Sequence, residues 1–504
     1  MSLVNERQGS PSREARESVK GGSISVKDEE IFEERAGSET AVDKEQDGDP
    51  SQLAREREAK LKKAYRRVDL RLIMWYSVLL ILIKASTMNI TNVAILNLEQ
   101  GTGIKHQLGD LTGAQWAWIL SAFAYPYMAL EPVSTVLMKR FSPRKWMSRI
   151  LLTWGTISMC QAATQNYGGL LVCRILLGFA EAGFWPGILF HLSFFYPADR
   201  TALRIAMLYT ANQFAGMLSG LLAFGLAYMN GVAGLAGWRW MFLLEGAPVL
   251  LGGVATILVL PDYPNDKAKF LSQEDRELIV SELPKNQPTA DSKTWDWSQV
   301  KLLAYNPVFY LLILIWASHC IGSFSVAMVL PTVFYALKLE NSKITQLLTL
   351  PPYAIGILVV LIIATQISKR KVNAWKCAII LEIINCGCYV ALLVVSNAVA
   401  KYVLVCFAIV CASGVIPILL PELIRTSSGT TATALTIGIV CCFAHTASIA
   451  GPQIYQDGYG PHYRLSYSVS LGLLAVAIAA MLVNWMLIRR RDVKAKAAAA
   501  EAGR

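Results

Sequence analysis

Long apolar runs alternate with short polar connections over most of the chain. An α-helix rises about 1.5 Å per residue, so about 20 apolar residues cross the hydrocarbon core of a bilayer. Runs of this length predict six membrane spans, one long polar connection and six further spans. The predicted spans cover residues 72–94, 113–137, 146–165, 168–195, 203–229, 238–260, 308–335, 345–367, 374–396, 400–420, 430–455 and 466–488.

The polar segments divide the chain into parts. Residues 1–64 are polar and poor in aromatic side chains, which predicts a disordered cytoplasmic tail. We assign 65–260 to the first six helices, 261–306 to a central cytoplasmic loop, 307–490 to the last six helices and 491–504 to a second tail. Since the start of the chain has no apolar core, we expect no cleavable signal peptide.

The central loop contains one signal for a helix. Ser272 is followed three residues later by Asp275, a spacing typical of a capped helix start. We therefore predict one short surface helix in this loop, with a bracing role rather than a catalytic one.

Composition and charge agree with a protein that lies in lipid. The chain is 54% hydrophobic and 16% charged, against about a quarter charged in soluble domains. Its formal charge of +11 could suggest nucleic-acid binding. The basic residues instead form short clusters in alternate loops, a pattern that predicts cytoplasmic termini and no nucleic-acid partner. We expect a multi-pass protein of the plasma membrane.

No motif predicts an enzyme. Patterns for a nucleotide-binding P-loop, a zinc protease, a serine hydrolase or an EF-hand do not occur. The ten cysteines lack zinc-ligand spacing with histidines. The sequence therefore predicts no catalytic activity, no cofactor and no metal.

Charged side chains inside apolar spans are the most informative positions, because each costs about 2.5–3.5 kcal/mol at a helix centre. Arg174 and Glu181 lie seven residues apart in the fourth span, hence on one helix face. A cation and a carboxylate on one inward face suit solute binding and protonation. A structural ion pair to neighbouring helices is the alternative.

Further candidates lie in four other spans. Tyr127 and Glu131 are one turn apart in the second span, where Glu131 is either protonatable or a packing carboxylate. His319 and His445 lie deep in the seventh and eleventh spans and either exchange protons or pack.

Polar residues of the first span and two glycines of the fifth span complete the candidates. Asn89 and Asn92 offer neutral hydrogen bonds to a solute. Lys84 lies deeper in the same span and is expected to snorkel toward the interface, with pairing to a carboxylate as the alternative. Gly216 and Gly220 form a G-x-x-x-G pair that predicts close helix packing.

Several blocks of sequence resemble the major facilitator superfamily, in particular its anion:cation symporter group and the fungal allantoate-permease-like branch. The matching blocks are LMKRFSPRKW (137–146), RILLGFAEAGFWPGILF (174–190), GVAGLAGWRWMFLLEGAPVLL (231–251), LPDYPNDKAKFLSQEDREL (260–278) and PPYAIG (351–356). The resemblance implies two six-helix bundles with alternating access around a central solute site. It also implies charge handling and proton coupling by Arg174 and Glu181, and transport of organic anions.

The chain departs from the family pattern in the first span. Ser86 and Thr87 occupy positions where family members usually carry an acidic and a basic residue. The cation expected to face an anionic solute is therefore missing, which favours a less charged solute or export.

Three functions remain as hypotheses. The first is proton-coupled uptake of a small organic anion, a carboxylate or vitamin-like compound, by a transporter that works as a monomer. The second is efflux of a secondary metabolite by proton antiport. The third is a nutrient receptor whose N-terminal tail signals after phosphorylation.

Overall fold

The computed structural model describes residues 50–264, 270–283, 296–368, 371–426, 430–460 and 462–502. Residues 63–504 form one compact unit, separate from residues 1–62. Each predicted span is built of helices, and the described residues contain no strand. The prediction of an all-α membrane protein is confirmed, with twelve spans in two groups of six.

The first six spans make up the N-terminal half. They are α3 (Met74–Val93), α5 (Gly113–Ala122) with α6 (Ala124–Phe141), α7 (Pro143–Cys160), α8 (Tyr167–Glu181) with α9 (Phe184–Leu192), α10 (Ala198–Leu226) and α11 (Gly237–Val259). A short helix, α4 (Ile104–Gln107), lies between the first and second spans.

The last six spans make up the C-terminal half. They are α14 (Pro307–His319) with the π-helix η6 (Cys320–Phe324), α15 (Ser325–Ala327) and α16 (Leu330–Ala336), α17 (Ser342–Leu348) with α18 (Leu350–Ser368), α19 (Ala374–Val394), α20 (Ala398–Thr426), α21 (Thr430–Ala444) with α22 (Thr446–Ile454), and α23 (Arg464–Ala502).

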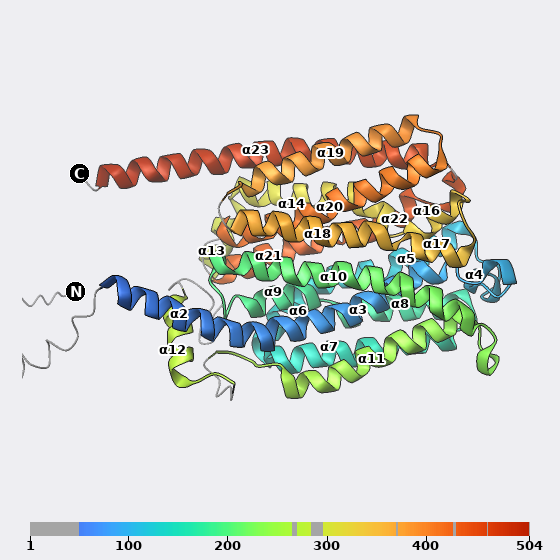
Figure 1. The fold of residues 1–504 in the computed structure, drawn as a ribbon, viewed down its shortest axis with the longest axis horizontal. Helices are drawn as coiled ribbons and strands as arrows, with labels where there is room; N and C mark the ends of the chain where they lie inside the picture. Colours follow the sequence, from blue (N-terminus) through green and yellow to red (C-terminus); the bar gives the residue numbers. More distant parts are fainter. Residues whose placement is uncertain are drawn as a thin grey trace, which may run out of the picture. The chain divides into compact units, whose positions relative to one another are not determined.

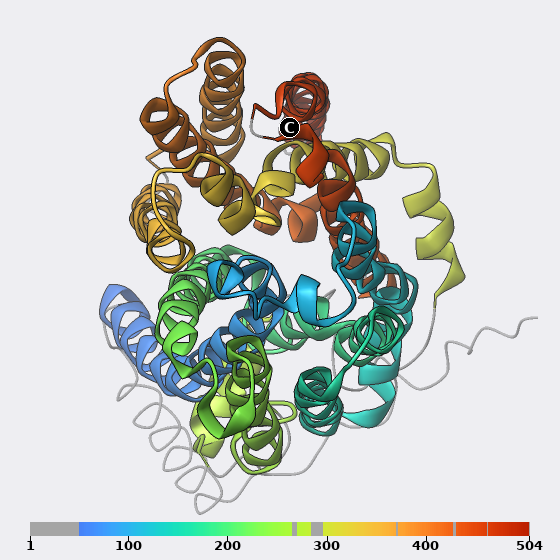
Figure 2. The ribbon, with the colours of Figure 1, turned by 90° about the vertical axis from the view of Figure 1, so that its right-hand side faces the viewer.

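The two halves lie side by side, with their long helices running in the same general direction (Figure 1). Viewed along the helices, the orange and red C-terminal half lies above the blue-green to green N-terminal half (Figure 2). Helix α10 packs against α18 and α20, and α21 and α22 pack against α6 and α5. Helices α5, α6 and α10 of the N-terminal half thus meet helices from the other half.

Apolarity differs between the halves. Eight helical segments of the described chain are long and apolar enough to cross a membrane. All six spans of the C-terminal half are among them, whereas the N-terminal half contributes only Tyr167–Leu192 and Gly237–Val259. The other spans of the N-terminal half carry more polar side chains, and several of these face the interior.

Breaks interrupt four spans near the middle of the structure. The second span breaks at Phe123, the fourth after Glu181, the seventh after Ala327, just beyond the π-helix η6, and the eleventh at His445. Irregular backbone at membrane depth is tolerated only where protein or a wet cavity satisfies its polar groups. The breaks therefore mark the region in which a solute site is expected.

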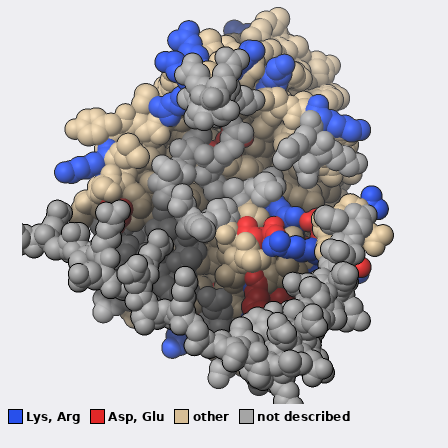
Figure 3. All heavy atoms as spheres, turned by 90° about the vertical axis from the view of Figure 1, so that its left-hand side faces the viewer, with Lys and Arg blue, Asp and Glu red and all other residues tan. Residues whose placement is uncertain are grey.

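The end of the bundle that carries Arg144, Arg204 and Arg489 is called the basic end. Lys and Arg side chains are spread over the described surface of this face (Figure 3). Asp69 accepts hydrogen bonds of 2.6 and 2.9 Å from Arg204, and Asp262 pairs with Arg144 at 3.2 Å. Within the N-terminal half, the first link joins the first span to the fifth, and the second link joins the third span to the sixth.

The polar connections differ from the sequence prediction in two places. Residues 50–64, predicted as part of a disordered tail, belong to α2 (Pro50–Val68), whose Ala, Glu, Lys and Arg residues are strong helix formers. Residues 1–49 of that predicted tail lie outside the described residues. Helix α23 continues to Ala502 and so covers most of the predicted second tail.

The central loop contains two described helices rather than one. α12 (Gln273–Glu282) begins as predicted, with Ser272 accepting a 3.2 Å hydrogen bond from the Asp275 amide. α13 (Trp297–Ala304) was not predicted. Asp296 caps α13, and hydrogen bonds from Ser298 hold the pKa of the Asp296 carboxyl below its usual value.

Candidate solute-binding site

A cavity of about 210 Å³ lies between the two halves, close to the four helix breaks. We call it the central cavity. Its walls come from α3, α6 and α8 to α10 on one side and from α14, η6, α18 and α20 to α22 on the other. At about 30 Å³ per water molecule, this is room for roughly seven waters, which suits a small solute.

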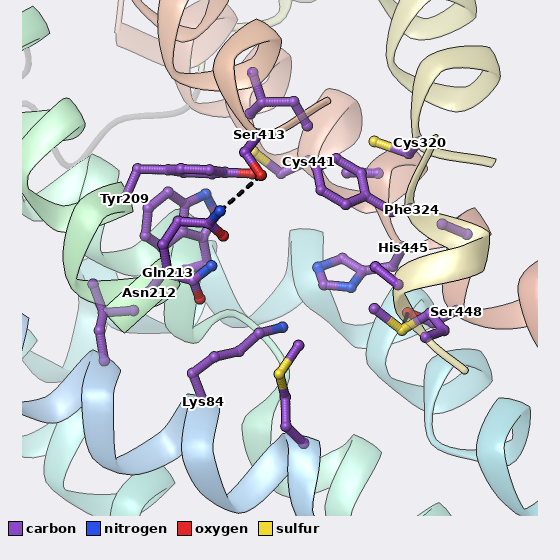
Figure 4. Close-up of a pocket in the computed structure, with 18 of the residues that line it drawn as sticks. Lys84, Tyr209, Asn212, Gln213, Cys320, Phe324, Ser413, Cys441, His445 and Ser448 are labelled. Atoms are coloured by element: carbon purple, nitrogen blue, oxygen red, sulfur yellow. Dashed lines mark hydrogen bonds between the residues drawn. The ribbon is translucent and has the colours of Figure 1, made fainter. Parts of the chain in front are cut away.

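Lys84 is the cation of the central cavity. Its side chain extends from α3 into the space toward which His445 points from the other half (Figure 4). Lys84 and Glu181, which also lines the cavity, are close enough to interact electrostatically. The alternative left open by the sequence, pairing with a carboxylate, therefore describes Lys84 better than snorkelling does.

Glu181 reaches the cavity because the fourth span breaks directly after it. Gly183 has a φ of +86°, a left-handed conformation that other residues rarely adopt. A Cβ at Gly183 would also lie 2.1 Å from Ser134 Oγ of α6. Glycine at this position thus permits the break that leaves Glu181 at the end of α8.

A smaller cavity of about 80 Å³ is lined by Arg174, Glu181, Lys84 and His445. It shares the last three residues with the central cavity. Arg174 and Glu181 interact electrostatically, as their common helix face predicts. Both predicted charges of the fourth span therefore line cavities between the halves.

Arg174 is held by the protein around it. Only 2% of the residue is exposed. Its Nε donates a 3.3 Å hydrogen bond to the Ile119 carbonyl, and its guanidinium lies 5.4 Å from the Phe123 ring centroid. Nη1 has no hydrogen-bond partner among the described residues, which leaves its two N–H donors for a solute or water.

His445, Tyr127 and Glu131 meet where the halves contact each other. The His445 and Tyr127 ring centroids are 4.1 Å apart, and His445 Nε2 lies 4.0 Å from Glu131 Oε1. His445 is in the break between α21 and α22, whereas the other two residues belong to α6. These three candidates therefore lie together although they were predicted from distant spans.

The remaining wall is largely apolar and includes several aromatic rings. Rings from both halves surround the charged groups: Trp185, Tyr209, Trp316, Phe324 and Tyr353. Asn212 and Gln213 add amides, and Gln213 donates a 2.7 Å hydrogen bond to Ser413 across the two halves (Figure 4). The wall thus offers an apolar body contact and a few neutral hydrogen bonds.

Besides Glu131, which lies next to His445, three predicted residues line neither cavity. Asn89 is fully buried and lies beside Glu245 of α11. Asn92 donates a 2.7 Å hydrogen bond to Ser219, and its carbonyl accepts one of 2.9 Å from Gln346 of the other half. His319 is 1% exposed and lies behind the cavity wall.

His319 has a partner that the sequence did not identify. Glu382 of α19 places both carboxylate oxygens within 2.9 and 3.0 Å of His319 Nδ1. Glu382 has no exposed surface. Its charge deep in the ninth span was the available signal, but the 63 residues that separate the partners concealed the pairing.

The halves also contact each other on both sides of the cavity. Gly216 and Gly220 of α10 face the C-terminal half, where added Cβ atoms would lie 2.8 Å from Tyr353 and 2.5 Å from Thr349. Close packing at this pair is as predicted. On the other side of the cavity, Cys442 Sγ lies 3.3 Å from the Met128 carbonyl.

The described residues contain no group of three or more His, Cys, Asp and Glu side chains that could hold a metal ion. The groups that are present, an ammonium, a guanidinium, a carboxyl and an imidazole, can bind an anion and exchange protons.

Comparison with known proteins identifies the kind of molecule. The sequence profile of the Major Facilitator Superfamily matches residues 77–452. The MFS transporter prlL of a fungal species (strain NRRL 50135) is 29% identical over 417 residues, covering 81% of this chain and 83% of that protein. A quinolone resistance transporter of Acinetobacter baumannii is 32% identical over 302 residues, covering 60% of this chain and 67% of that protein.

Solved structures agree on the fold. A crystal structure of a bacterial homologue of the human lysosomal transporter Spinster, inward-facing and unoccupied, superposes with a TM-score of 0.60. The two sequences are 15% identical, and the match covers 83% of this chain and 96% of the other. At this identity the likeness concerns the fold alone.

Proposed function

The chain belongs to the Major Facilitator Superfamily, and from this premise we propose that it couples protons to the uptake of a small organic anion through the central cavity. That it is a multi-pass membrane transporter follows from the family. The substrate class, the proton and the direction are the proposal.

The observation that supports this proposal most strongly is that Lys84 and Glu181 line the central cavity together and interact electrostatically. An ammonium buried among aromatic rings needs a negative partner, because an isolated charge is costly to remove from water. Glu181 provides that partner when it is ionised. A carboxylate solute provides it when Glu181 is protonated.

The competition between Glu181 and the solute gives a coupling mechanism. A proton that neutralises Glu181 frees Lys84 to bind the anion, and departure of the anion lets Glu181 lose its proton and pair with Lys84 again. Proton and anion therefore bind together and leave together. His445, which points into the same space, is a second group able to exchange a proton there.

Lys84 also compensates for the departure from the family pattern at Ser86 and Thr87, where a basic residue is missing. Ser86 is buried and shares a 2.9 Å hydrogen bond with Ser158, so it faces away from the solute. Lys84 supplies the cation of the first span from a position slightly earlier in the helix. This restores the argument for an anionic solute.

The energetics follow from the charges. One proton moving with one monoanion carries no net charge, so the membrane potential contributes nothing and the pH gradient drives the cycle. Each pH unit is worth about 1.4 kcal/mol, or about tenfold accumulation.

We place the basic end in the cytoplasm and the transporter in the plasma membrane. One chain supplies both walls of the cavity, which supports a functional monomer.

Export is the second candidate function. The aromatic wall suits an apolar solute, and the Acinetobacter relative is named for quinolone resistance. The receptor hypothesis rests on the N-terminal tail, of which residues 1–49 lie outside the described residues.

Transport by purified protein in liposomes tests the proposal. With acid outside, a panel of small carboxylates is offered to protein whose orientation is set by a tag on one terminus. The proposal predicts accumulation of at least one carboxylate that follows the pH gradient and ignores an imposed potential. Accumulation of only uncharged or cationic solutes, and only when the liposome interior is the acidic side, would favour export by proton antiport.

A further inference from the structure

An acid and an amide face each other inside the N-terminal half, away from both cavities. Glu245 of α11 is 5% exposed, and Asn89 of α3 has no exposed surface. Neither residue lines the central or the smaller cavity. The solute site therefore does not explain why a carboxyl group lies here.

The polar atoms of the two side chains lack other partners. Both carboxyl oxygens of Glu245 and both polar atoms of Asn89 are buried without a hydrogen bond of normal geometry in the described part of the chain. The two side chains nevertheless interact with each other. Buried polar groups nearly always have a partner, so four such atoms at one place require an explanation.

Within the described residues, no cation pairs with the Glu245 carboxyl. Helices α3, α7 and α10 and the turns η3 (Gln161–Ala163) and η4 (Ala227–Met229) pack against α11. The described titratable groups of these elements are Tyr76, Lys84, Arg144, Lys145, Arg149, Cys160, Arg200, Arg204, Tyr209 and Tyr228. Helix α11 itself adds Arg239. Neither oxygen of Glu245 has a hydrogen-bond partner among these described groups, and Asn89 is a neighbour with which the carboxyl interacts.

Basic and hydroxyl groups on the neighbouring helices α3 and α7 contact other residues. Lys84 interacts with Glu181, and Arg149 lies over the Trp146 ring at 4.2 Å. Ser86 and Ser158 hydrogen-bond to each other at 2.9 Å. An ionised Glu245 would thus be a bare carboxylate in an apolar layer, which is among the costliest arrangements in a protein.

We propose that Glu245 is a proton-binding site that is separate from the solute cavity and is closed by Asn89. The protonated carboxyl donates its O–H to Asn89 Oδ1, and Asn89 Nδ2 donates to the other carboxyl oxygen. This acid–amide pair satisfies all four buried atoms with one proton, which is taken from water and returned to water. The site stands whatever solute the central cavity binds.

The proton joins two helices that have different tasks. α11 packs closely on α7, whereas α3 carries Lys84 and Met88 into the central cavity. Loss of the proton replaces a closed pair by a carboxylate with a single donor, which weakens the link between α3 and α11. Occupancy of the site is therefore coupled to the position of α3.

Infrared spectroscopy of the full-length protein in lipid nanodiscs tests this at neutral pH. The difference between wild type and Glu245→Gln is expected to show the loss of one protonated-carboxyl C=O band. Loss of an ionised carboxylate band instead would overturn the proposal. Glu274→Gln, an exposed position on α12, is the matched control and is expected to remove an ionised carboxylate band.

Thermal unfolding supplies a second readout. Glu245→Gln is expected to fold with a Tm close to wild type, because a neutral amide is isosteric with the protonated acid and can pair with Asn89. Asn89→Leu leaves the acid without a partner and is expected to lower the Tm by several degrees. A Glu245→Gln chain that fails to fold would contradict a neutral Glu245.

The exchange of the two groups is the strictest variant. The double substitution Asn89→Asp with Glu245→Gln keeps every side-chain length and restores one acid and one amide. It is expected to regain the protonated-carboxyl band that Glu245→Gln loses. Absence of the band in a folded double variant would show that the pair does not hold a proton.

Discussion

The two halves of the protein have different chemistry although each contributes six helices to one fold. The charges of the central and smaller cavities, Lys84, Arg174 and Glu181, all come from the N-terminal half. The C-terminal half contributes aromatic rings, Ser413 and His445. All six of its spans are strongly apolar, against two in the other half. The comparison assigns the two cations and the carboxyl of Glu181 to one wall, whereas the other wall adds aromatic rings and the imidazole of His445.

Carboxyl groups show the same contrast. Glu181 of the N-terminal half lies in the cavity next to two cations. Glu382 of the C-terminal half lies behind the cavity wall and is hydrogen-bonded to His319. A buried carboxyl serves coupling only where a solute can compete for its partner, so the two groups are expected to respond differently to substitution.

Removal of the Lys84 charge is expected to have the largest effect. Lys84→Ala should lower kcat/KM for a carboxylate roughly 30-fold, since a hydrogen bond to a charged group contributes about 2 kcal/mol. Uptake and exchange should fall together. Lys376→Ala, at an exposed position, is the control, and normal exchange by Lys84→Ala would remove this residue from solute binding.

Glu181→Gln is expected to separate accumulation from exchange. A permanently neutral side chain leaves Lys84 free for the anion but cannot return a proton. Accumulation driven by a pH gradient should be lost, while exchange of labelled for unlabelled solute should stay within about threefold of wild type, a change worth less than 1 kcal/mol. Both are measured in the same liposomes, and full accumulation would exclude Glu181 from coupling.

Gly220→Val is expected to act through the contact between the halves. A Cβ there would lie 2.5 Å from Thr349 Oγ1, and overpacking of this kind costs about 1–3 kcal/mol. The conformation in which the two halves close on each other near Gly220 should become about tenfold less favourable, and transport should slow accordingly. Gly225→Val on the same helix is the control, because nothing lies within 4 Å of its Cβ.

Glu382→Ala is expected to have the smallest effect on transport and a clear effect on stability. Breaking a buried pair typically costs about 3–5 kcal/mol. The Tm should fall, whereas pH-driven accumulation by the folded variant should stay within about threefold, below 1 kcal/mol. Loss of coupling here, with folding intact, would erase the proposed contrast between the halves.

The sequence predicted the spans well because span length and apolarity are set by the bilayer itself. It also placed Arg174 and Glu181 correctly on one face, since seven residues return a helix to nearly the same direction. The pair Tyr127 and Glu131 was recognised separately from His445. Their meeting could not be predicted, because it depends on how α6 and the break at His445 approach each other.

The errors have a physical pattern. Snorkelling was expected for Lys84 because depth and direction in a bundle depend on neighbouring helices, here the break after Glu181 that places a carboxyl opposite it. Glu245 and Glu382 were overlooked for a similar reason. Each is the one acidic residue of its helix. Its role depends on a residue of another helix, Asn89 for Glu245 and His319 for Glu382.

Proton uptake on solute binding tests the central claim most directly. Purified protein in weakly buffered detergent solution, with a pH indicator, is titrated with the carboxylate that the liposome panel identifies as the best substrate. At a pH where Glu181 of the free protein is ionised, wild type is predicted to take up about one proton per bound anion, and Glu181→Gln none. Binding by wild type without proton uptake across the acid-to-neutral range would contradict the competition between Glu181 and the solute for Lys84.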